Sequence, residues 1–454
     1  MDAAHIQGKR FSVIGGARSG IAVAKLLRAN GATVFLSDVA PLDKMLSVRK
    51  ELENADIATE FGVNSSRVLE AEVLVLSPGV PSGIPIVKEA LARGLKVVSE
   101  IEAASWFCPA PMIAVTGTNG KTTTTTLLGR MFHDARRQYA VAGNIGTAFS
   151  QVVGELGAEA TAILEISSFQ LDHIETFKPK VSVILNITPD HLDRYEHSFE
   201  KYAASKCRVF ENQRSGDVVV YNDDDEVTRS LVEKHIHPQV MKLPFSVQHR
   251  VEQGGYLDDD HVRVRVGGAD VEIIGKDDIS IRGVHNLYNA MAATLAARAL
   301  NISTASLRST LRNFKGVEHR LEFVREVNGV TYVNDSKATN VDSVWYALQS
   351  FDKPLVVLLG GRDKGNDYSR LTDLVKKNAR AIVAIGESAE KVESAFRDIV
   401  PLKKAGSMND AVQMAGALAT KGDIVLLSPA CASFDWFDNY EHRGRVFKEI
   451  VMAL

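Results

Sequence analysis

The chain has 454 residues, of which 45 % are hydrophobic and 24 % are charged. At roughly 100–200 residues per domain this length suggests about three domains, and the globular composition excludes a disordered, collagen-like or coiled-coil protein. A formal net charge of −3 gives no electrostatic footprint for nucleic acid or an anionic membrane, so we expect neither partner.

The cysteines and the apolar runs indicate the compartment. Cys108, Cys207 and Cys431 are far apart and form no CxxC pair, which disfavours a disulfide framework or a zinc knuckle and favours a reducing environment. The N-terminal residues are polar and no run reaches about 18 apolar residues, so we expect no signal peptide and no transmembrane helix. We therefore expect a cytoplasmic protein.

In chain order, the dominant pattern is a short β-branched run, a glycine-bearing turn and a helical segment. This alternation is typical of βαβ units around a parallel sheet, so we predict an α/β fold. The runs expected to form strands are 11–14, 33–36, 73–76, 96–98, 112–115, 162–166, 181–187, 218–221, 354–359, 381–385 and 423–427.

Breaks in this pattern divide the chain into three α/β blocks, 1–100, 101–316 and 317–454. The pattern stops over 99–111, where two prolines lie close together, and a helix is expected to end near 313–316. We predict a linker at each of these two positions.

Two further segments deviate from a purely parallel plan. Residues 242–281 are polar and strand-like, which predicts a small antiparallel excursion inside the middle block. Asn328-Gly329 lies between two apolar runs and predicts a β-hairpin.

The strongest chemical signal is a glycine-rich loop over 117–122 (GTNGKT) between a predicted strand and a predicted helix. Glycines let backbone N–H groups converge on a phosphate, Lys121 can reach the β- and γ-phosphates, and Thr122 can bind magnesium. The first glycine of a standard Walker A loop is replaced by Val115. The loop predicts a nucleoside triphosphate ligand and does not say which reaction uses it.

A weaker glycine pattern, GGARSG over 15–20, follows the first predicted strand, and Asp38 ends the next one. Ala17 occupies the third position of the dinucleotide fingerprint, where backbone has to approach a pyrophosphate closely. An NAD site, plain strand–helix packing and another nucleotide-like ligand remain open here.

Three residues of the middle block are candidates for metal or acid–base chemistry. Glu165 lies near the end of an apolar strand, where a carboxylate is costly unless it is bound to a metal or to a salt-bridge partner. His191 follows the next strand, and adjacent parallel strands bring their following loops to one edge of a sheet. The spacing around Lys206 alone indicates a helix-surface lysine.

Several segments together resemble the Mur ligase family, and within it the members that add D-glutamate. NDSKATN at 334–340 and SPACASFD at 428–435 are the most specific of them. The other segments are 117–123, 143–146, 165–170, 190–194, 285–289, 318–320 and 360–364.

The resemblance implies an N-terminal Rossmann-like domain for the uridine end of a nucleotide sugar, a central P-loop ATPase domain and a C-terminal Rossmann-like domain for the incoming amino acid. It implies that ATP phosphorylates the carboxylate of UDP-N-acetylmuramoyl-L-alanine and that D-glutamate then displaces the phosphate. This reaction is a cytoplasmic step of peptidoglycan synthesis, and we expect a monomer.

The resemblance also implies the catalytic and metal-binding residues. Lys121 would supply positive charge at the phosphates, Thr122 and Glu165 would hold one magnesium ion, and His191 and Lys206 would hold a second. Lys206 would do so as a carbamate, since an ammonium group cannot bind a cation. The predicted catalytic residues are Lys121, His191 and Lys206.

Further residues are carried over to the substrates. ATP would contact Gly117, Thr118, Asn119, Gly120, Lys121, Thr122, Thr123, Asn289, Arg320 and Asp335. The nucleotide sugar would contact Arg18, Ser19, Asp38, Ser77, Asn144, Ser167 and His191. D-Glutamate would contact Lys337, Thr339, Lys364, Ser433 and Tyr440, although the family more usually has phenylalanine at the position of Tyr440. Cys431, between these residues, is interpreted as a small buried hydrophobe.

Three alternatives remain. The chain could be another Mur-type ligase that adds a different amino acid, a nucleotide-binding regulator without ligase activity, or an NAD oxidoreductase, the last of which Ala17 disfavours.

Overall fold

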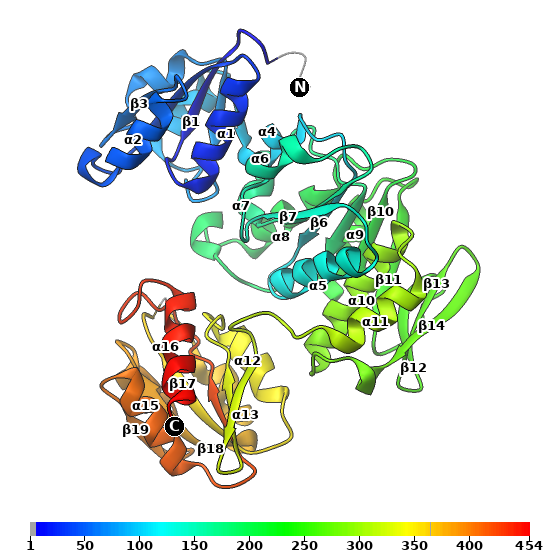
Figure 1. The fold of residues 1–454 in the computed structure, drawn as a ribbon, viewed down its shortest axis with the longest axis vertical. Helices are drawn as coiled ribbons and strands as arrows, with labels where there is room; N and C mark the ends of the chain where they lie inside the picture. Colours follow the sequence, from blue (N-terminus) through cyan, green and yellow to red (C-terminus); the bar gives the residue numbers. More distant parts are fainter. Residues whose placement is uncertain (1–5, 364) are drawn as a thin grey trace. The chain divides into compact units, whose positions relative to one another are not determined.

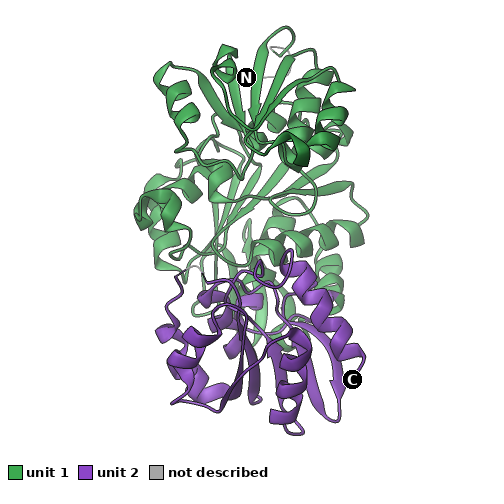
Figure 2. Ribbon diagram, turned by 90° about the vertical axis from the view of Figure 1, so that its left-hand side faces the viewer, with its two compact units in different colours: residues 1–279, 288–313 green, residues 280–287, 314–454 purple. Residues whose placement is uncertain are grey.

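The computed structural model describes residues 6–363 and 365–454. Figure 2 shows the two compact units into which the chain divides. Unit 1 comprises 1–279 and 288–313, and unit 2 comprises 280–287 and 314–454. Unit 1 contains a five-stranded and a nine-stranded sheet, and unit 2 contains a six-stranded sheet (Figure 1). Most neighbouring strands are parallel, which confirms the predicted α/β class.

The five-stranded sheet is entirely parallel, with the order β3-β2-β1-β4-β5. Phe11 and Val13 of the central strand are buried with Val23 and Leu27 of helix α1. Strand order reverses between β1 and β4, so the carboxyl ends of these two strands form a crevice typical of ligand sites. The strands are β1 Arg10–Ile14, β2 Thr33–Asp38, β3 Ala58–Phe61, β4 Val73–Leu76 and β5 Lys96–Ser99. The helices are α1 Arg18–Ala29, α2 Leu46–Glu53, α3 Pro85–Ala92 and α4 Glu100–Ser105.

Helix α4 lies where the sequence predicts a linker, so that part of the 99–111 prediction is wrong. Glu100 and Glu102 of this helix are at most 1 % exposed. Glu100 accepts hydrogen bonds from the backbone N and from Oγ of Ser150, at 2.7 and 2.6 Å. Most donors to these two carboxylates come from distant segments, so the sequence around the helix does not indicate that glutamates occupy its buried face.

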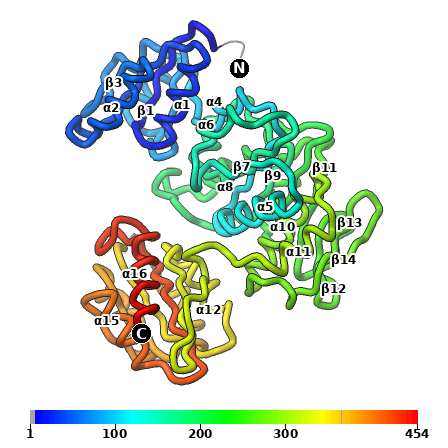
Figure 3. Tube along the Cα trace, viewed as in Figure 1, coloured from blue at the N-terminus to red at the C-terminus, as the bar shows by residue number. Residues whose placement is uncertain are grey.

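The nine-stranded sheet has the order β14-β13-β12-β11-β10-β9-β6-β8-β7. β12, β13 and β14 are antiparallel, as predicted for 242–281, but β12 pairs in parallel with β11 and so extends the main sheet (Figure 3). The strands are β6 Met112–Thr116, β7 Tyr139–Gly143, β8 Thr161–Glu165, β9 Val181–Ile184, β10 Val218–Asn222, β11 Met241–Ser246, β12 Gly254–Asp258, β13 His261–Val266 and β14 Ala269–Gly275. The helices are α5 Lys121–Asp134, α6 Phe149–Val152, α7 Ser168–Leu171, α8 Phe199–Cys207, α9 Glu226–His235, α10 Val284–Ala299 and α11 Thr304–Asn313.

The six-stranded sheet of unit 2 has the order β15-β16-β20-β17-β18-β19. The predicted hairpin at Asn328-Gly329 joins β15 and β16, and both turn residues have positive φ, 52° and 78°, as a tight hairpin turn requires. The strands are β15 Glu322–Val327, β16 Val330–Asn334, β17 Leu355–Gly360, β18 Ala379–Ile385, β19 Leu402–Lys404 and β20 Ile424–Leu427. The helices are α12 Val341–Gln349, α13 Thr372–Asn378, α14 Ala389–Phe396, α15 Met408–Leu418 and α16 Tyr440–Met452. No helix among the described residues combines the length and the hydropathy needed to cross a membrane.

Candidate active site

The glycine-rich loop of unit 1 leaves the carboxyl end of the buried strand β6 and enters helix α5. Gly117 and Gly120 have φ of 145° and 89°, in the region that favours glycine. A Cβ on Gly120 would lie 2.2 Å from Oδ1 of Asn289, so this position also has no room for a side chain. The helix begins at Lys121, which corrects the predicted loop: Lys121 and Thr122 belong to the first turn of α5.

Two lysines meet at the backbone of this loop. Nζ of Lys121 donates to the carbonyl oxygens of Gly117 and Thr118, both at 2.8 Å, and Nζ of Lys206 donates to the same Gly117 oxygen at 2.9 Å. Lys206 is only 2 % exposed, so the interpretation of Lys206 as a helix-surface residue is wrong. Burial, together with the charge of Lys121, lowers the pKa of Lys206 well below its usual 10.5.

Glu165 ends strand β8 beside the start of the loop, since it pairs in register with Val115 of β6. Its side chain is 2 % exposed, and Oε1 accepts a hydrogen bond from Nδ2 of Asn144 at 2.9 Å. Oε2 is buried without a hydrogen-bond partner among the described residues. No salt bridge of 4.0 Å or less to Glu165 occurs in that part of the chain, so the salt-bridge alternative is not supported. A buried carboxylate oxygen without a donor suits a bound cation.

His191 follows strand β9 on a loop that is tied to the phosphate loop. Thr118 Oγ1 lies 3.0 Å from both the N and the O of Thr188 and 3.0 Å from the hydroxyl of Tyr202. His191 itself has φ of 50°, its side chain is half exposed, and its ring lies edge-on to that of Phe169 at 5.2 Å. The structure therefore brings the His191 loop, Lys121, Lys206 and Glu165 to one edge of the sheet.

The remaining predicted ATP residues of unit 1 surround the same loop. Thr122 and Thr123 are buried, and Oγ1 of Thr123 has no hydrogen-bond partner in the described structure. Oδ1 of Asn289 accepts from Oγ1 of Thr124 at 3.3 Å. Asn186, which sequence reasoning missed, accepts the backbone N–H of Asn119 at 2.9 Å. Asn186 was predicted to lie inside a strand, but β9 ends at Ile184 and frees it to hold the loop.

In the first block, the predicted sugar-nucleotide residues lie at the crevice between β1 and β4. Oγ of Ser77 donates to the carbonyl of Gly15 at 3.0 Å, and Asp38 accepts the backbone N–H groups of Gly16 and Ala40. A Cβ on Gly20 would lie 1.8 Å from the Gly15 oxygen, so this glycine permits close helix–strand packing. Arg18 and Ser19 open helix α1, with Arg18 exposed and Ser19 half-buried.

Two other predicted sugar-nucleotide residues, Asn144 and Ser167, lie in the middle block and form hydrogen bonds there. The side chain of Asn144 points to Glu165, and Ser167 forms a capping box with Gln170 at the start of α7. Both side chains therefore have hydrogen-bond partners within the described residues. The bond from Asn144 orients Glu165, which is a candidate metal ligand.

A cavity of about 660 Å³ within unit 1 was not anticipated, because none of the predicted substrate residues lines it. Its walls include Ser82, Phe169, His173 and Arg194. Oγ of Ser82 lies 2.7 Å from Nε2 of His173, and the guanidinium of Arg194 lies 4.3 Å from the centre of the Phe169 ring. Phe169 and Arg194 both belong to segments that carry the family resemblance, which is the only signal that could have indicated them.

In unit 2, Asp335 is buried at the end of strand β16. It accepts hydrogen bonds from Oγ of Ser428 at 2.8 Å and from the backbone N of Leu321 at 3.2 Å. Burial raises the pKa of Asp335 to about 7, and the positive charge of Arg320 acts in the opposite direction. Arg320 and Asp335, both predicted for ATP, thus lie close enough to interact.

The predicted D-glutamate residues also lie in unit 2. Nζ of Lys337 lies 5.2 Å from the centre of the Tyr440 ring and 3.4 Å from its hydroxyl. Ser433 is buried and Thr339 is half-buried, while Lys364 lies outside the described residues. Cys431 is 1 % exposed, as expected for a small buried residue.

The glycine loop, the two converging lysines and the buried carboxylate at one edge of a parallel sheet define a nucleotide-binding α/β protein of the phosphate-loop class. Three family models match the chain in order: Mur ligase MurD-like, N-terminal domain, at 9–99; Mur ligase middle domain at 115–297; and Mur ligase, glutamate ligase domain, at 319–431.

Curated relatives match the chain from end to end. A UDP-N-acetylmuramoylalanine–D-glutamate ligase of Salinibacter ruber is 50 % identical over 99 % of both chains, and one of Chloroherpeton thalassium is 46 % identical over 99 % of both. The chain belongs to the Mur ligase family.

Solved structures show the same fold. The UDP-N-acetylmuramate-alanine ligase of Thermotoga maritima has a TM-score of 0.60 at 18 % identity, covering 98 % of this chain and 99 % of that one. A pseudomurein peptide ligase type C of Methanothermus fervidus has a TM-score of 0.61 at 17 % identity, covering 98 % and 100 %. Members of the family depend on ATP and use Mg²⁺.

Proposed function

We propose that the chain is an ATP-dependent acid–amino-acid ligase that joins D-glutamate to UDP-N-acetylmuramoyl-L-alanine, a cytoplasmic step of peptidoglycan synthesis. The observation that carries the proposal is the meeting of Lys121 and Lys206 at the Gly117 carbonyl, beside the buried Glu165. The choice of substrates is supported by relatives of that name, 50 % and 46 % identical over 99 % of the chain.

The chemistry has two steps. A carboxylate oxygen of the L-alanyl group attacks the γ-phosphorus of ATP, the bond to the β-phosphate oxygen breaks, and ADP and an acyl phosphate result. The amine of D-glutamate then attacks the acyl carbon, loses a proton, and expels phosphate as the amide forms. Both organic reactants are anions, so the ammonium of Lys121 has to offset negative charge where they meet.

The residues present suit two magnesium ions. Thr122 and Glu165 would hold one ion, and the free buried Oε2 of Glu165 has the chemistry of a magnesium ligand. His191 and Lys206 would hold the other. When bound, magnesium would neutralise phosphate charge and so lower the repulsion between the reactants.

Lys206 would bind its ion as a carbamate. Its depressed pKa favours the neutral amine, which can form a bond from Nζ to the carbon of CO₂ and lose a proton. The product carries two oxygens in place of an ammonium. Burial at 2 % exposure would protect this adduct from bulk water.

The other assignments belong to the same proposal. Domains 1–100, 101–316 and 317–454 would bind the nucleotide sugar, ATP and the amino acid, and the enzyme would act as a monomer. Asn289, Arg320 and Asp335 would contact ATP beside the loop residues Gly117, Thr118, Asn119, Gly120, Lys121, Thr122 and Thr123. Arg18, Ser19, Asp38, Ser77, Asn144, Ser167 and His191 would contact the nucleotide sugar, and Lys337, Thr339, Lys364, Ser433 and Tyr440 would contact D-glutamate.

A phosphate-release assay tests the proposal. The chain is mixed with UDP-N-acetylmuramoyl-L-alanine, magnesium and ATP, and each candidate amino acid is offered in turn. We expect release with D-glutamate only, together with an amide product detected by mass spectrometry. Release with a different amino acid would indicate another Mur-type ligase, and a nucleotide-induced conformational change without product would indicate a regulator.

A further inference from the structure

Residues 317–322 of unit 2, here called the Arg320 turn, have an unusual backbone. His319 and Leu321, on either side of Arg320, have φ of 65° and 44°. This region is uncommon for any residue other than glycine and is rarer for leucine than for histidine, and such strain persists only where the surroundings hold it. Contacts from other parts of unit 2 therefore have to hold the Arg320 turn in this conformation.

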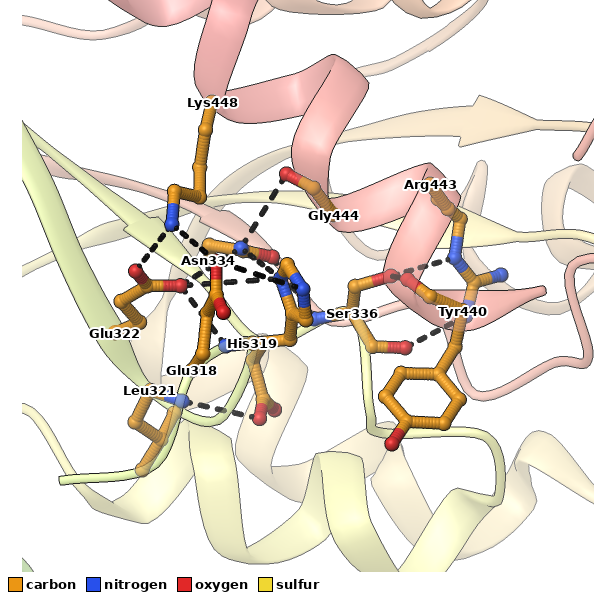
Figure 4. A network of polar contacts seen from close by, with 11 residues as sticks. Glu318, His319, Leu321, Glu322, Asn334, Ser336, Tyr440, Arg443, Gly444 and Lys448 are labelled. Atoms are coloured by element: carbon orange, nitrogen blue, oxygen red, sulfur yellow. Dashed lines mark hydrogen bonds and ion pairs between the residues drawn. The ribbon is translucent and has the colours of Figure 1, made fainter. Parts of the chain in front are cut away.

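The first set of contacts fixes His319, which is 4 % exposed (Figure 4). Its backbone N donates to Oε2 of Glu322 at 2.8 Å, and its carbonyl accepts from the backbone N of Lys337 at 3.0 Å. Its Nδ1 lies 2.9 Å from Nδ2 of Asn334. Since Oδ1 of Asn334 accepts the N–H of Ser336 at 3.2 Å, the amide nitrogen is the atom that faces the ring, and Nδ1 of His319 is the acceptor.

The second set comes from one face of helix α16. A Cβ on Gly444 would lie 2.2 Å from Nδ1 of His319, so the absence of a side chain at Gly444 makes room for the ring. One turn later, Nζ of Lys448 donates to Oε1 of Glu318 at 2.8 Å and to Oε1 of Glu322 at 2.6 Å. The ammonium of Lys448 thus links Glu318, directly before His319, to Glu322, three residues after it (Figure 4).

A metal ion is the obvious alternative for this cluster. One ligand atom from each of Glu318, His319 and Glu322 lies within 4.8 Å of the others. The ammonium of Lys448, however, contacts both carboxylates, and the amide of Asn334 donates to His319 and, at 3.1 Å, to Oε2 of Glu322. The cluster already contains its own cation and donors, so it is satisfied as a structural network.

The network continues to the residues proposed for ATP. Oδ1 of Asp335 accepts the N–H of Leu321, the residue after Arg320, at 3.2 Å. We propose that Gly444 and Lys448 are positioning residues for ATP: they hold the Arg320 turn in its strained form and thereby place the guanidinium of Arg320. This inference rests on the proposed role of Arg320 in ATP binding, and neither positioning residue would touch the nucleotide.

Steady-state kinetics of the full chain test the inference. Lys448→Met and Gly444→Ala should each raise the KM for ATP roughly tenfold, because a displaced guanidinium loses its geometry toward phosphate. The KM values for D-glutamate and UDP-N-acetylmuramoyl-L-alanine should stay within about twofold, and Lys448→Arg should restore most of the ATP affinity. The matched controls are Lys376→Met and Gly406→Ala. Lys376 is an exposed residue of α13, and a Cβ on Gly406 would approach only one atom, at 3.8 Å.

A double-mutant cycle separates positioning from general destabilisation. If Lys448 acts through Arg320, Lys448→Met should add little to the KM for ATP in an Arg320→Ala background. Additive effects, or an unchanged KM for ATP in folded Lys448→Met, would overturn the inference even if Gly444→Ala failed to fold. An unchanged KM in Arg320→Ala alone would refute the proposed role of Arg320 and this inference with it, while D-glutamate-dependent turnover would still test the ligase activity separately.

Discussion

The phosphate loop of unit 1 and the Arg320 turn of unit 2 each place a cationic side chain beside left-handed backbone, but by different means. In the loop, the left-handed positions are Gly117 and Gly120, where this conformation costs little. In the turn they are His319 and Leu321, where it is unfavourable. The residues of the loop can therefore adopt its backbone conformation at little cost, whereas the conformation of the turn has to be held by contacts from elsewhere in unit 2.

This difference separates two kinds of mutational effect. Side chains that project from the loop can be removed with a loss of chemistry and little loss of structure. Backbone positions of the loop, and buried groups around the turn, should instead change stability or ligand affinity.

The largest effect is expected for Lys121→Ala. Nζ of Lys121 donates to the backbone carbonyls of Gly117 and Thr118 in its own loop, so we expect the fold to persist without the side chain. Losing its charge should lower kcat by about 10³-fold, as removal of one preorganised electrostatic group does. Acyl-phosphate formation is measured by trapping with hydroxylamine and folding by circular dichroism. Normal turnover would contradict the assignment of this site.

Lys206→Ala should lower activity by about 100-fold, as loss of a metal-site group does. Added formate or acetate should restore part of it, since a small carboxylate can replace the missing carbamate oxygens. Lys234→Ala, on the exposed face of α9, is the control and should neither lose activity nor respond to the acids. Full activity of Lys206→Ala without any acid would refute the carbamate.

Much of the fold was predictable because most strands of the five-stranded and six-stranded sheets are apolar runs between turn signals. The strands that were missed lack this signal: β3 is Ala-Thr-Glu-Phe, β7 is Tyr-Ala-Val-Ala-Gly, and β19 has three residues of which two are lysines. β9 was predicted too long, since it ends at Ile184 and Asn186 binds the phosphate loop through its backbone and its side chain. In each of these segments the conformation depends on a partner that is distant in sequence: β2 for β3, β8 for β7, β18 for β19 and the phosphate loop for Asn186.

The site shows the same limit. Gly-Lys-Thr at a strand–helix junction indicated the phosphate loop without any other information. The burial of Lys206 could not be inferred from the small and polar residues around it in α8, because it depends on how α8 packs beneath the loop. The roles of Gly444 and Lys448 were equally hidden, since their contacts lie more than 100 residues away in sequence.

Gly120→Ala tests the backbone half of the comparison. Positive φ and the 2.2 Å approach to Asn289 Oδ1 should together lower the free energy of unfolding by about 2–3 kcal/mol. Gly157→Ala, where a Cβ meets no atom within 4 Å, should change it by less than about 0.5 kcal/mol. Urea unfolding compares the two variants. Equal stability would mean that the loop does not require glycine at this position.

The smallest effect is expected at Asp335 and concerns pH. Burial raises the pKa of Asp335 in the folded chain to about 7, against 3.8 as the ordinary value, despite the nearby charge of Arg320. Between these two values the folded state binds more protons than the unfolded state, so the contribution of Asp335 to stability falls as pH rises through this window and is constant above it. Asp335→Asn removes the titration. The loss of stability from pH 6 to pH 8, measured by urea unfolding, should therefore be smaller in the variant by about 1–2 kcal/mol. An identical loss in both proteins would show that Asp335 ionises normally, and that the buried groups around the Arg320 turn impose no electrostatic cost.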